Sequence, residues 1–142
     1  MEYTAIGDTV NLSSRLEGAT KVYGVKILVG ESTVHELQRP AKLREIDLMR
    51  VKGKDQPVAI YEAIDHCTEE TFPAMDGVLE AYHCGLDRYR GRDWRAATQF
   101  FEAALALHAA DRPSRIYLER CRRFIAEPPP EDWDGVWVLA EK

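Results

Sequence analysis

The sequence predicts an α+β fold in which a helix and short strands are followed by a wholly helical segment. Short apolar runs separated by turn residues extend to about residue 64, whereas apolar residues between 75 and 125 recur every three or four positions. The polar stretch between these parts ends in Phe72-Pro73, which indicates a linker. We therefore divide the chain into residues 1–66, a linker 67–73, a helical segment 74–126 and a tail 127–142 that contains Pro and Trp.

The first elements are a short strand that contains Thr4 and a helix that follows Gly7-Asp8. Asn11 and Arg15 lie four residues apart, so an amide and a guanidinium share one face of the first helical turns. The N-terminus of a helix carries free N–H groups and a partial positive charge, which favour phosphate. The planar fork of Arg matches phosphate oxygens. The pattern favours a phosphate-binding helix, and the alternative is an ordinary amphipathic helix N-terminus.

The run from Thr4 to Arg15 resembles a signature of the class III nucleotide cyclases, which form cyclic AMP or cyclic GMP from a nucleoside triphosphate. The family pattern Gly-Asp-x-Val-Asn-x-x-x-Arg matches residues 7–15. The resemblance implies that Asn11 orients the ribose and that Arg15 stabilises charge on the reacting phosphate. It also implies ATP as substrate and a homodimer partner chain, because the family site forms across a dimer interface.

The resemblance continues through the rest of residues 1–66. We expect a strand at 26–29, a short helix at 31–37, a strand within 43–51 and a strand at 57–62. These elements would make a partial ferredoxin-like domain of a helix and antiparallel strands. The family lysine that contacts the triphosphate matches Lys52 in the turn Val-Lys-Gly-Lys. The alternative for Lys52 and Lys54 is a solvated hairpin tip.

Thr4 is the position that the resemblance links to the choice of purine. Cyclases that use ATP typically carry Asp, Thr or Ser there, whereas those that use GTP more often carry Cys or a similar small group. A hydroxyl can accept from an exocyclic amine or donate to a ring nitrogen. Thr4 therefore favours adenine. Guanylate cyclase and a plain β-branched strand residue are the alternatives.

The metal site of the family is the main part that this sequence does not match. The family uses two metal-binding aspartates, for Mg²⁺ or Mn²⁺, and a purine-contacting lysine, all of which lie upstream of the segment that resembles this chain. Asp8 matches the Asp of the signature and not a metal ligand. We therefore expect no metal site in this chain and no cyclic nucleotide from these residues alone. The rival interpretation is a non-catalytic interaction module that carries a vestigial cyclase segment.

The helical segment predicts three helices. Gly91-Arg92-Asp93 ends the first, with Asp93 as the N-cap of the second, and the break at 111–114 precedes the third. The small residues Ala97 and Ala104 beside Phe101 suit close packing of two helices. We place one broad apolar face of the second helix at Trp94, Ala97, Phe100, Phe101, Ala104, Leu105 and Leu107.

The run from Gly91 to Leu105 resembles a tetratricopeptide (TPR) repeat, although the proline that follows such a repeat is displaced to Pro113. Repeats of this kind need neighbours to bury their faces. The segment is therefore either a protein-interaction module or a helical cap. A helical appendage followed by a tail with three prolines and Asp-Trp-Asp-Gly resembles the C-terminal extension of some bacterial adenylate cyclases with sensory domains. We expect the tail to dock Trp133 and Trp137 on the helices.

Composition limits the partners. A net charge of −5 argues against a nucleic-acid surface, whose affinity depends on phosphate binding. The three cysteines form no Cys-x-x-Cys pair, which argues against a zinc site and fits a reducing cytoplasmic compartment. No apolar run reaches the length of a membrane span, so we expect no membrane contact by this chain. The resemblance allows a parent protein that is anchored to the inner membrane through a preceding part.

Overall fold

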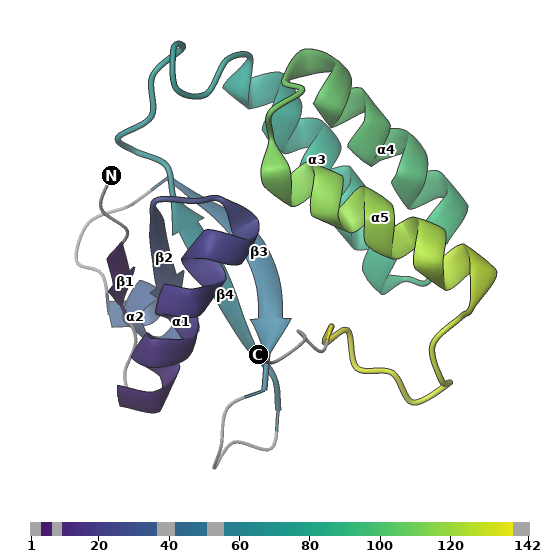
Figure 1. The fold of residues 1–142 in the computed structure, drawn as a ribbon, viewed down its shortest axis with the longest axis horizontal. Helices are drawn as coiled ribbons and strands as arrows, with labels where there is room; N and C mark the ends of the chain where they lie inside the picture. The colour runs from purple at the N-terminus through teal and green to yellow at the C-terminus, as the bar shows by residue number, and fades with distance from the viewer. Residues whose placement is uncertain (1–3, 7–9, 37–41, 51–55, 138–142) are drawn as a thin grey trace. The chain divides into compact units, whose positions relative to one another are not determined.

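The computed structural model describes residues 4–6, 10–36, 42–50 and 56–137 (Figure 1). The chain forms two compact units. The first contains Met1–His66 together with Trp133–Lys142, and the second contains Cys67–Asp132. The first unit holds the sheet and the second is helical, so the predicted α+β class is confirmed.

The first unit is built around a four-stranded mixed sheet with the order β1-β2-β4-β3. Strand β1 (Thr4–Ile6) pairs with β2 (Ile27–Gly30) in parallel, whereas β4 (Val58–Ala63) runs antiparallel to both β2 and β3 (Leu43–Met49). The predicted antiparallel strands are therefore β2, β4 and β3, and β1 adds a parallel pairing at the edge of the sheet. Helix α1 (Val10–Tyr23) joins β1 to β2, and a helical crossover returns the chain in the same direction.

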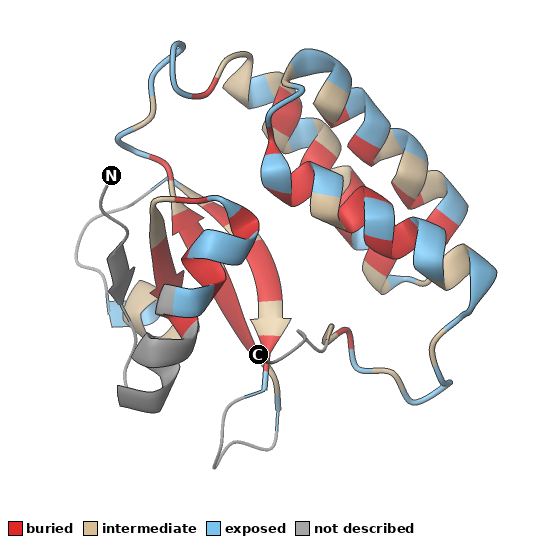
Figure 2. Ribbon diagram, in the orientation of Figure 1, coloured by how far each residue is buried: buried red, intermediate tan, exposed pale blue. Residues whose placement is uncertain are grey.

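One stripe of α1 forms the core of the first unit. Leu16, Ala19 and Tyr23 are at most 2% exposed and recur at the spacing of one helical face. They are buried in the same unit as Leu28 of β2 and Ile60 of β4, both 0% exposed. Figure 2 shows most of the two central strands in the red of buried residues.

Helix α1 ends at a glycine. Gly24 has a φ of 65°, and the N–H of Val25 donates to the carbonyl of Thr20 over 3.1 Å. A left-handed glycine with this bond closes the last helical turn. The chain therefore turns directly into β2.

The remaining elements of the first unit lie close to their expected positions. Helix α2 (Glu31–Glu36) matches the predicted helix except for Leu37, which lies outside the described residues, and β3 ends at Met49. The pairing of β3 with β4 shifts between Glu45 and Asp47, which marks a β-bulge.

The second unit consists of α3 (Met75–Arg90), α4 (Trp94–Leu107) and α5 (Arg112–Ala126). Asp93 caps α4 as predicted, because its carboxylate accepts from the N–H of Ala96 over 3.3 Å. At the start of α5, the hydroxyl of Ser114 donates to the carboxylate of Asp111 over 2.5 Å, and both residues are buried. The Asp93 contact caps α4, whereas the Ser114–Asp111 bond joins two side chains at the start of α5.

An aromatic cluster fills the core of the second unit. Tyr82 meets Phe101 and Tyr117 edge to face, with centroid distances of 5.9 Å. Tyr89 contacts Tyr117 at 4.9 Å and Trp94 at 5.4 Å, again edge to face. Such pairs stabilise beyond the apolar area that they bury.

Two expectations about apolar residues are corrected. Leu107, expected on the buried face of α4, is 50% exposed because it ends the helix beside the stripe that Ala97, Phe101 and Ala104 form. Trp133 and Trp137, expected to dock on the helices, belong to the unit of the sheet.

Gly85→Ala is expected to lower the free energy of unfolding of the helical unit by about 1–3 kcal/mol, as overpacking does. An added Cβ would lie 2.9 Å from two atoms of the Phe101 ring, and Phe101 is 0% exposed and has no space to move into. The helical preference of Ala, about 1 kcal/mol, offsets only part of this cost. Chemical denaturation followed by circular dichroism measures the change.

Gly18→Ala is the matched control. Gly18 is exposed in α1, and nothing lies within 4 Å of an added Cβ. This variant should gain about 0.5–1 kcal/mol from helix propensity. Similar responses of the two glycines would contradict close packing of α3 against α4.

Candidate functional site

The residues predicted to bind nucleotide start at the edge of the sheet. Thr4 is the first residue of β1 and pairs in register with Ile27 of β2. Asn11 and Arg15 are the second and sixth residues of α1. The side chains of these three residues, and Lys52 as a whole, lie outside the described residues. The described backbone thus brings a strand and the first turns of the following helix together, as the sequence predicts.

Positions 11 and 15 share one face of α1, because a helix turns by about 100° per residue and four residues make slightly more than one turn. Both positions lie within the first two turns of α1, near the positive end of the helix dipole. The buried stripe of α1 is formed by Leu16, Ala19 and Tyr23.

A buried hydrogen bond holds the other end of α1. The hydroxyl of Tyr23 donates to the carboxylate of Asp47 in β3, and these residues are 1% and 2% exposed. A hydrogen bond to a charged group is stronger than one between neutral groups. It ties the last residue of α1 to the sheet.

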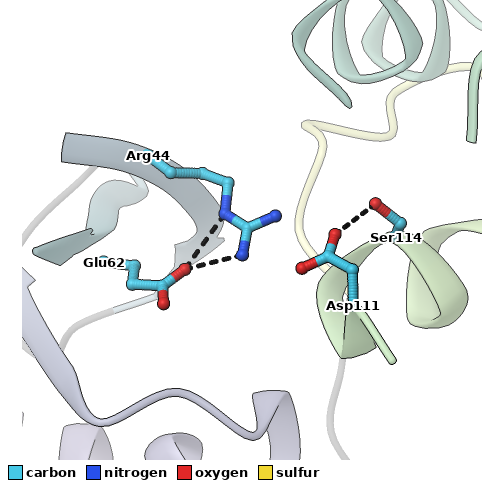
Figure 3. Close-up of polar contacts among 4 residues, drawn as sticks. All are labelled: Arg44, Glu62, Asp111 and Ser114. Atoms are coloured by element: carbon cyan, nitrogen blue, oxygen red, sulfur yellow. Dashed lines mark hydrogen bonds and ion pairs between the residues drawn. The ribbon is translucent and has the colours of Figure 1, made fainter. Parts of the chain in front are cut away.

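A buried ion pair joins β3 to β4. The guanidinium of Arg44 donates to one carboxylate oxygen of Glu62 from Nε over 3.0 Å and from Nη2 over 2.8 Å (Figure 3). Arg44 and Glu62 face each other in the strand register and are 2% and 7% exposed. Sequence reasoning missed this pair and the Tyr23–Asp47 bond. The available signal was a set of charged residues inside two otherwise apolar strands.

The end of β3 leads directly toward Lys52. Arg50 is the last described residue before the segment 51–55, and its guanidinium forms an ion pair with Asp134. Lys52 therefore lies two residues after Arg50, which is paired with Asp134 of the tail.

Metal ligands are not gathered in the described part of the chain. No group of three or more His, Cys, Asp or Glu side chains that could hold an ion occurs among those residues. Buried Asp47 and Glu62 each bind a protein donor instead. The described residues therefore do not fit a two-metal site.

The helical unit has a surface hollow of about 530 Å³. It is lined by Cys84, Asp87, Arg88, Gly91, Asp93 and Phe100, which come from α3, α4 and the turn between them. Cys121 lies in the core of the same unit, where burial raises the pKa of its thiol to about 11. Cys121 is thus protonated at neutral pH and is no nucleophile.

No described helix is long and apolar enough to cross a membrane.

Three curated adenylate cyclases are similar to this chain. "Adenylate cyclase, terminal-differentiation specific" of Dictyostelium discoideum is 35% identical over 124 residues, which cover 85% of this chain and 6% of that protein. The adenylate cyclase of Anabaena cylindrica is 51% identical over 65 residues, or 44% of this chain and 13% of that protein. Adenylate cyclase 1 of Rhizobium meliloti (strain 1021) is 39% identical over 64 residues, or 45% of this chain and 10% of that protein.

The extent of these matches limits what they show. No protein-family model and no solved structure matches the chain. The chain spans at most 13% of the length of these relatives. A match over 85% of the chain extends beyond residues 1–66, so the similarity to the Dictyostelium protein includes part of the helical unit. The chain contains a region that is related to adenylate cyclases.

Proposed function

We propose that this chain is the C-terminal half of the catalytic domain of a class III adenylate cyclase, followed by a TPR-like helical extension. The parent reaction converts ATP to 3′,5′-cyclic AMP and pyrophosphate. The ribose 3′-oxygen attacks the α-phosphorus in line and loses its proton, while the bond to the pyrophosphate oxygen breaks. The observation that carries the proposal is the β1–α1 unit, which holds positions 4, 11 and 15 in a chain similar to adenylate cyclases.

Each proposed residue acts by position and charge. Arg15 stabilises negative charge on the phosphates, Asn11 holds the ribose, and Lys52 holds the triphosphate. Thr4 contacts the adenine edge. Fixed donors aimed at developing charge are an effective source of rate enhancement, because they need no reorganisation during the reaction.

The parent enzyme needs groups that the described residues do not supply. Mg²⁺ or Mn²⁺ would neutralise the triphosphate and activate the ribose hydroxyl in the parent, on ligands from outside this chain. A second copy of the parent chain would complete the site as a homodimer. The helical extension would bind a protein partner, and its presence in the region matched by the Dictyostelium relative supports a role beside the cyclase-related part.

Product formation tests the proposal. The purified 142-residue chain with ATP and either Mg²⁺ or Mn²⁺ should yield no cyclic AMP. A longer natural protein that contains this chain should convert ATP, in preference to GTP. Cyclic AMP from the chain alone would contradict the predicted inactivity. An inactive longer protein would favour the non-catalytic interaction module, and a preference for GTP would favour guanylate cyclase.

A further inference from the structure

The turn between α3 and α4 holds a segment of proline residues. Arg92 donates from Nη2 to the carbonyl of Pro129 over 2.8 Å and from Nη1 to the carbonyl of Pro130 over 2.9 Å. All three residues belong to the helical unit. The two ends of one guanidinium thus bind two successive proline carbonyls.

The backbone of the turn determines the direction of Arg92. This residue has a φ of 67°, an uncommon conformation for a residue other than glycine. The N–H of Arg92 donates to the carbonyl of Tyr89 over 3.1 Å, and the N–H of Asp93 donates to that of Arg88 over 2.9 Å. Residues held in such a sparsely populated conformation cluster at functional sites. The strained residue of this turn is the one that binds the prolines.

An aromatic cluster supports the guanidinium. The Cζ atom of Arg92 lies 6.0 Å from the centroid of the Trp94 ring, at the limit of a cation–π contact. Trp94 is only 9% exposed, and its ring lies 5.4 Å from that of Tyr89 and 4.7 Å from that of Phe124. Tyr89, Arg92, Trp94 and Phe124 together are called the Arg92 site below.

A proline segment suits the Arg92 site for three reasons. Three consecutive prolines favour the polyproline II conformation, whose carbonyls have no hydrogen-bond partner within the segment. Proline has no N–H, so no backbone donor loses its water when the segment binds. A segment that is already extended and stiff also loses little entropy. The contacts of Arg92 are therefore those expected of a polyproline II receptor.

The bound prolines can exchange. Pro128 and Pro130 are exposed and Pro129 is half-buried. Hydrogen bonds beside water contribute little net free energy, because water replaces either partner. The tail stays bound because only Glu127 separates Pro128 from the end of α5, which gives it a high effective concentration. A concentrated ligand with the same carbonyls can therefore displace it.

We propose that the Arg92 site binds a proline-rich segment of a partner protein in the polyproline II conformation, and that Pro128–Pro130 occupies it until such a segment displaces the tail. Arg92 sets the specificity, because its planar fork reaches two carbonyls at once, whereas a lysine offers a single point of contact. Nucleotide binding by the first unit plays no part in this site. An inactive parent enzyme would therefore leave the Arg92 site intact.

Binding of fluorescein-labelled octaproline to the intact 142-residue chain, followed by fluorescence anisotropy, is the first test. The wild type should bind the peptide weakly, because its own tail competes. The variant Pro128→Gly/Pro129→Gly/Pro130→Gly has a flexible tail that leaves the site more often. This variant should bind octaproline about tenfold more tightly than the wild type. No gain in affinity would overturn the proposal.

Changes at Arg92, made in the triple-glycine variant, test the fork. Arg92→Gly removes both donors and also the backbone strain, so the chain should fold while binding is lost. Arg92→Lys keeps the charge but should weaken binding about tenfold. Arg95→Lys is the matched control, because Arg95 is exposed in α4, and it should leave the affinity unchanged. Equal affinities of the Arg92→Gly and Arg95→Lys chains would overturn the proposal.

Nuclear magnetic resonance of the unaltered chain decides the same question if the triple-glycine variant does not fold. Excess octaproline should move the amide resonances of Glu131 and Asp132, which follow the displaced prolines, toward the positions of a disordered chain. Arg92→Gly should show these positions without any peptide. Unchanged resonances in the wild type at millimolar octaproline would overturn the displacement.

Analytical ultracentrifugation tests the tail of a second copy as the occupant. The wild type and Arg92→Gly should sediment alike, because the ligand is a different protein. A concentration-dependent dimer of the wild type that Arg92→Gly abolishes would overturn the proposal and assign the site to exchange of tails between copies.

Discussion

Glu62→Ala is expected to lower the free energy of unfolding of the first unit by about 3–5 kcal/mol, the cost of leaving a buried charge without its partner. Arg44 is 2% exposed and directs two N–H groups at one oxygen of Glu62. An arginine keeps its charge at any pH at which the protein folds, so it cannot adapt by losing a proton. Urea denaturation followed by far-ultraviolet circular dichroism measures the loss.

The double variant Arg44→Met/Glu62→Leu separates the charge from the packing. Replacement of a buried ion pair by apolar residues of similar volume is often neutral or stabilising. We therefore expect the double variant to recover most of the stability that Glu62→Ala loses. Arg88→Ala is the exposed control, because the Arg88–Asp93 pair is 57% and 53% exposed with its atoms 4.0 Å apart. A loss below about 1 kcal/mol in Glu62→Ala would contradict a buried, mutually dependent pair.

The parts of the fold that the sequence predicted are those that local chemistry determines. Asp93 marks the start of α4 because a short carboxylate can bind the N–H three residues later. Ala97 and Ala104 are buried, as the predicted close helix packing requires. The cap depends on residues within one helical turn, and the pattern of Ala97, Phe101 and Ala104 that predicts the packing lies within two turns of one helix.

The features of the fold that the sequence did not predict depend on residues that lie far apart in the chain. Alternation in β3 and β4 shows which residues share a face, but it does not identify Arg44 as the partner of Glu62, 18 residues away. The same limit applies to Asp134 and Arg50, which are 84 residues apart. The parallel pairing of β1 with β2 follows from the crossover by α1 and not from the strand sequences.

In the candidate site, too, the features set by neighbouring residues were predicted and those set by distant residues were not. The order of strand and helix around Thr4, Asn11 and Arg15 was predicted and is present in the described backbone, whereas residues 7–9 between them lie outside the described residues. The Tyr23–Asp47 bond, which ties the far end of that helix to the sheet, was not predicted. A local signature identifies the residues proposed to contact nucleotide, whereas the contacts that hold their helix come from distant strands.

Arg15→Ala is expected to lower kcat of the intact parent enzyme by about a hundredfold or more, as removal of one charge-stabilising donor does elsewhere. A factor of a hundred corresponds to about 2.7 kcal/mol of transition-state stabilisation. Since the proposed contact strengthens as charge develops on the phosphates, kcat should fall more than the affinity for ATP. Cyclic AMP formation from ATP, measured at saturating ATP and metal, gives the value.

Two further variants on α1 separate charge, geometry and helix stability. Arg15→Lys keeps the charge but loses the planar fork, so its kcat should lie between those of the wild type and Arg15→Ala. Lys21→Ala removes an exposed charge from the last turn of the same helix and should leave kcat near the wild-type value. Near-normal turnover in Arg15→Ala would remove Arg15 from the mechanism. Equal losses in Arg15→Ala and Lys21→Ala would assign the effect to the stability of α1 and not to the transition state.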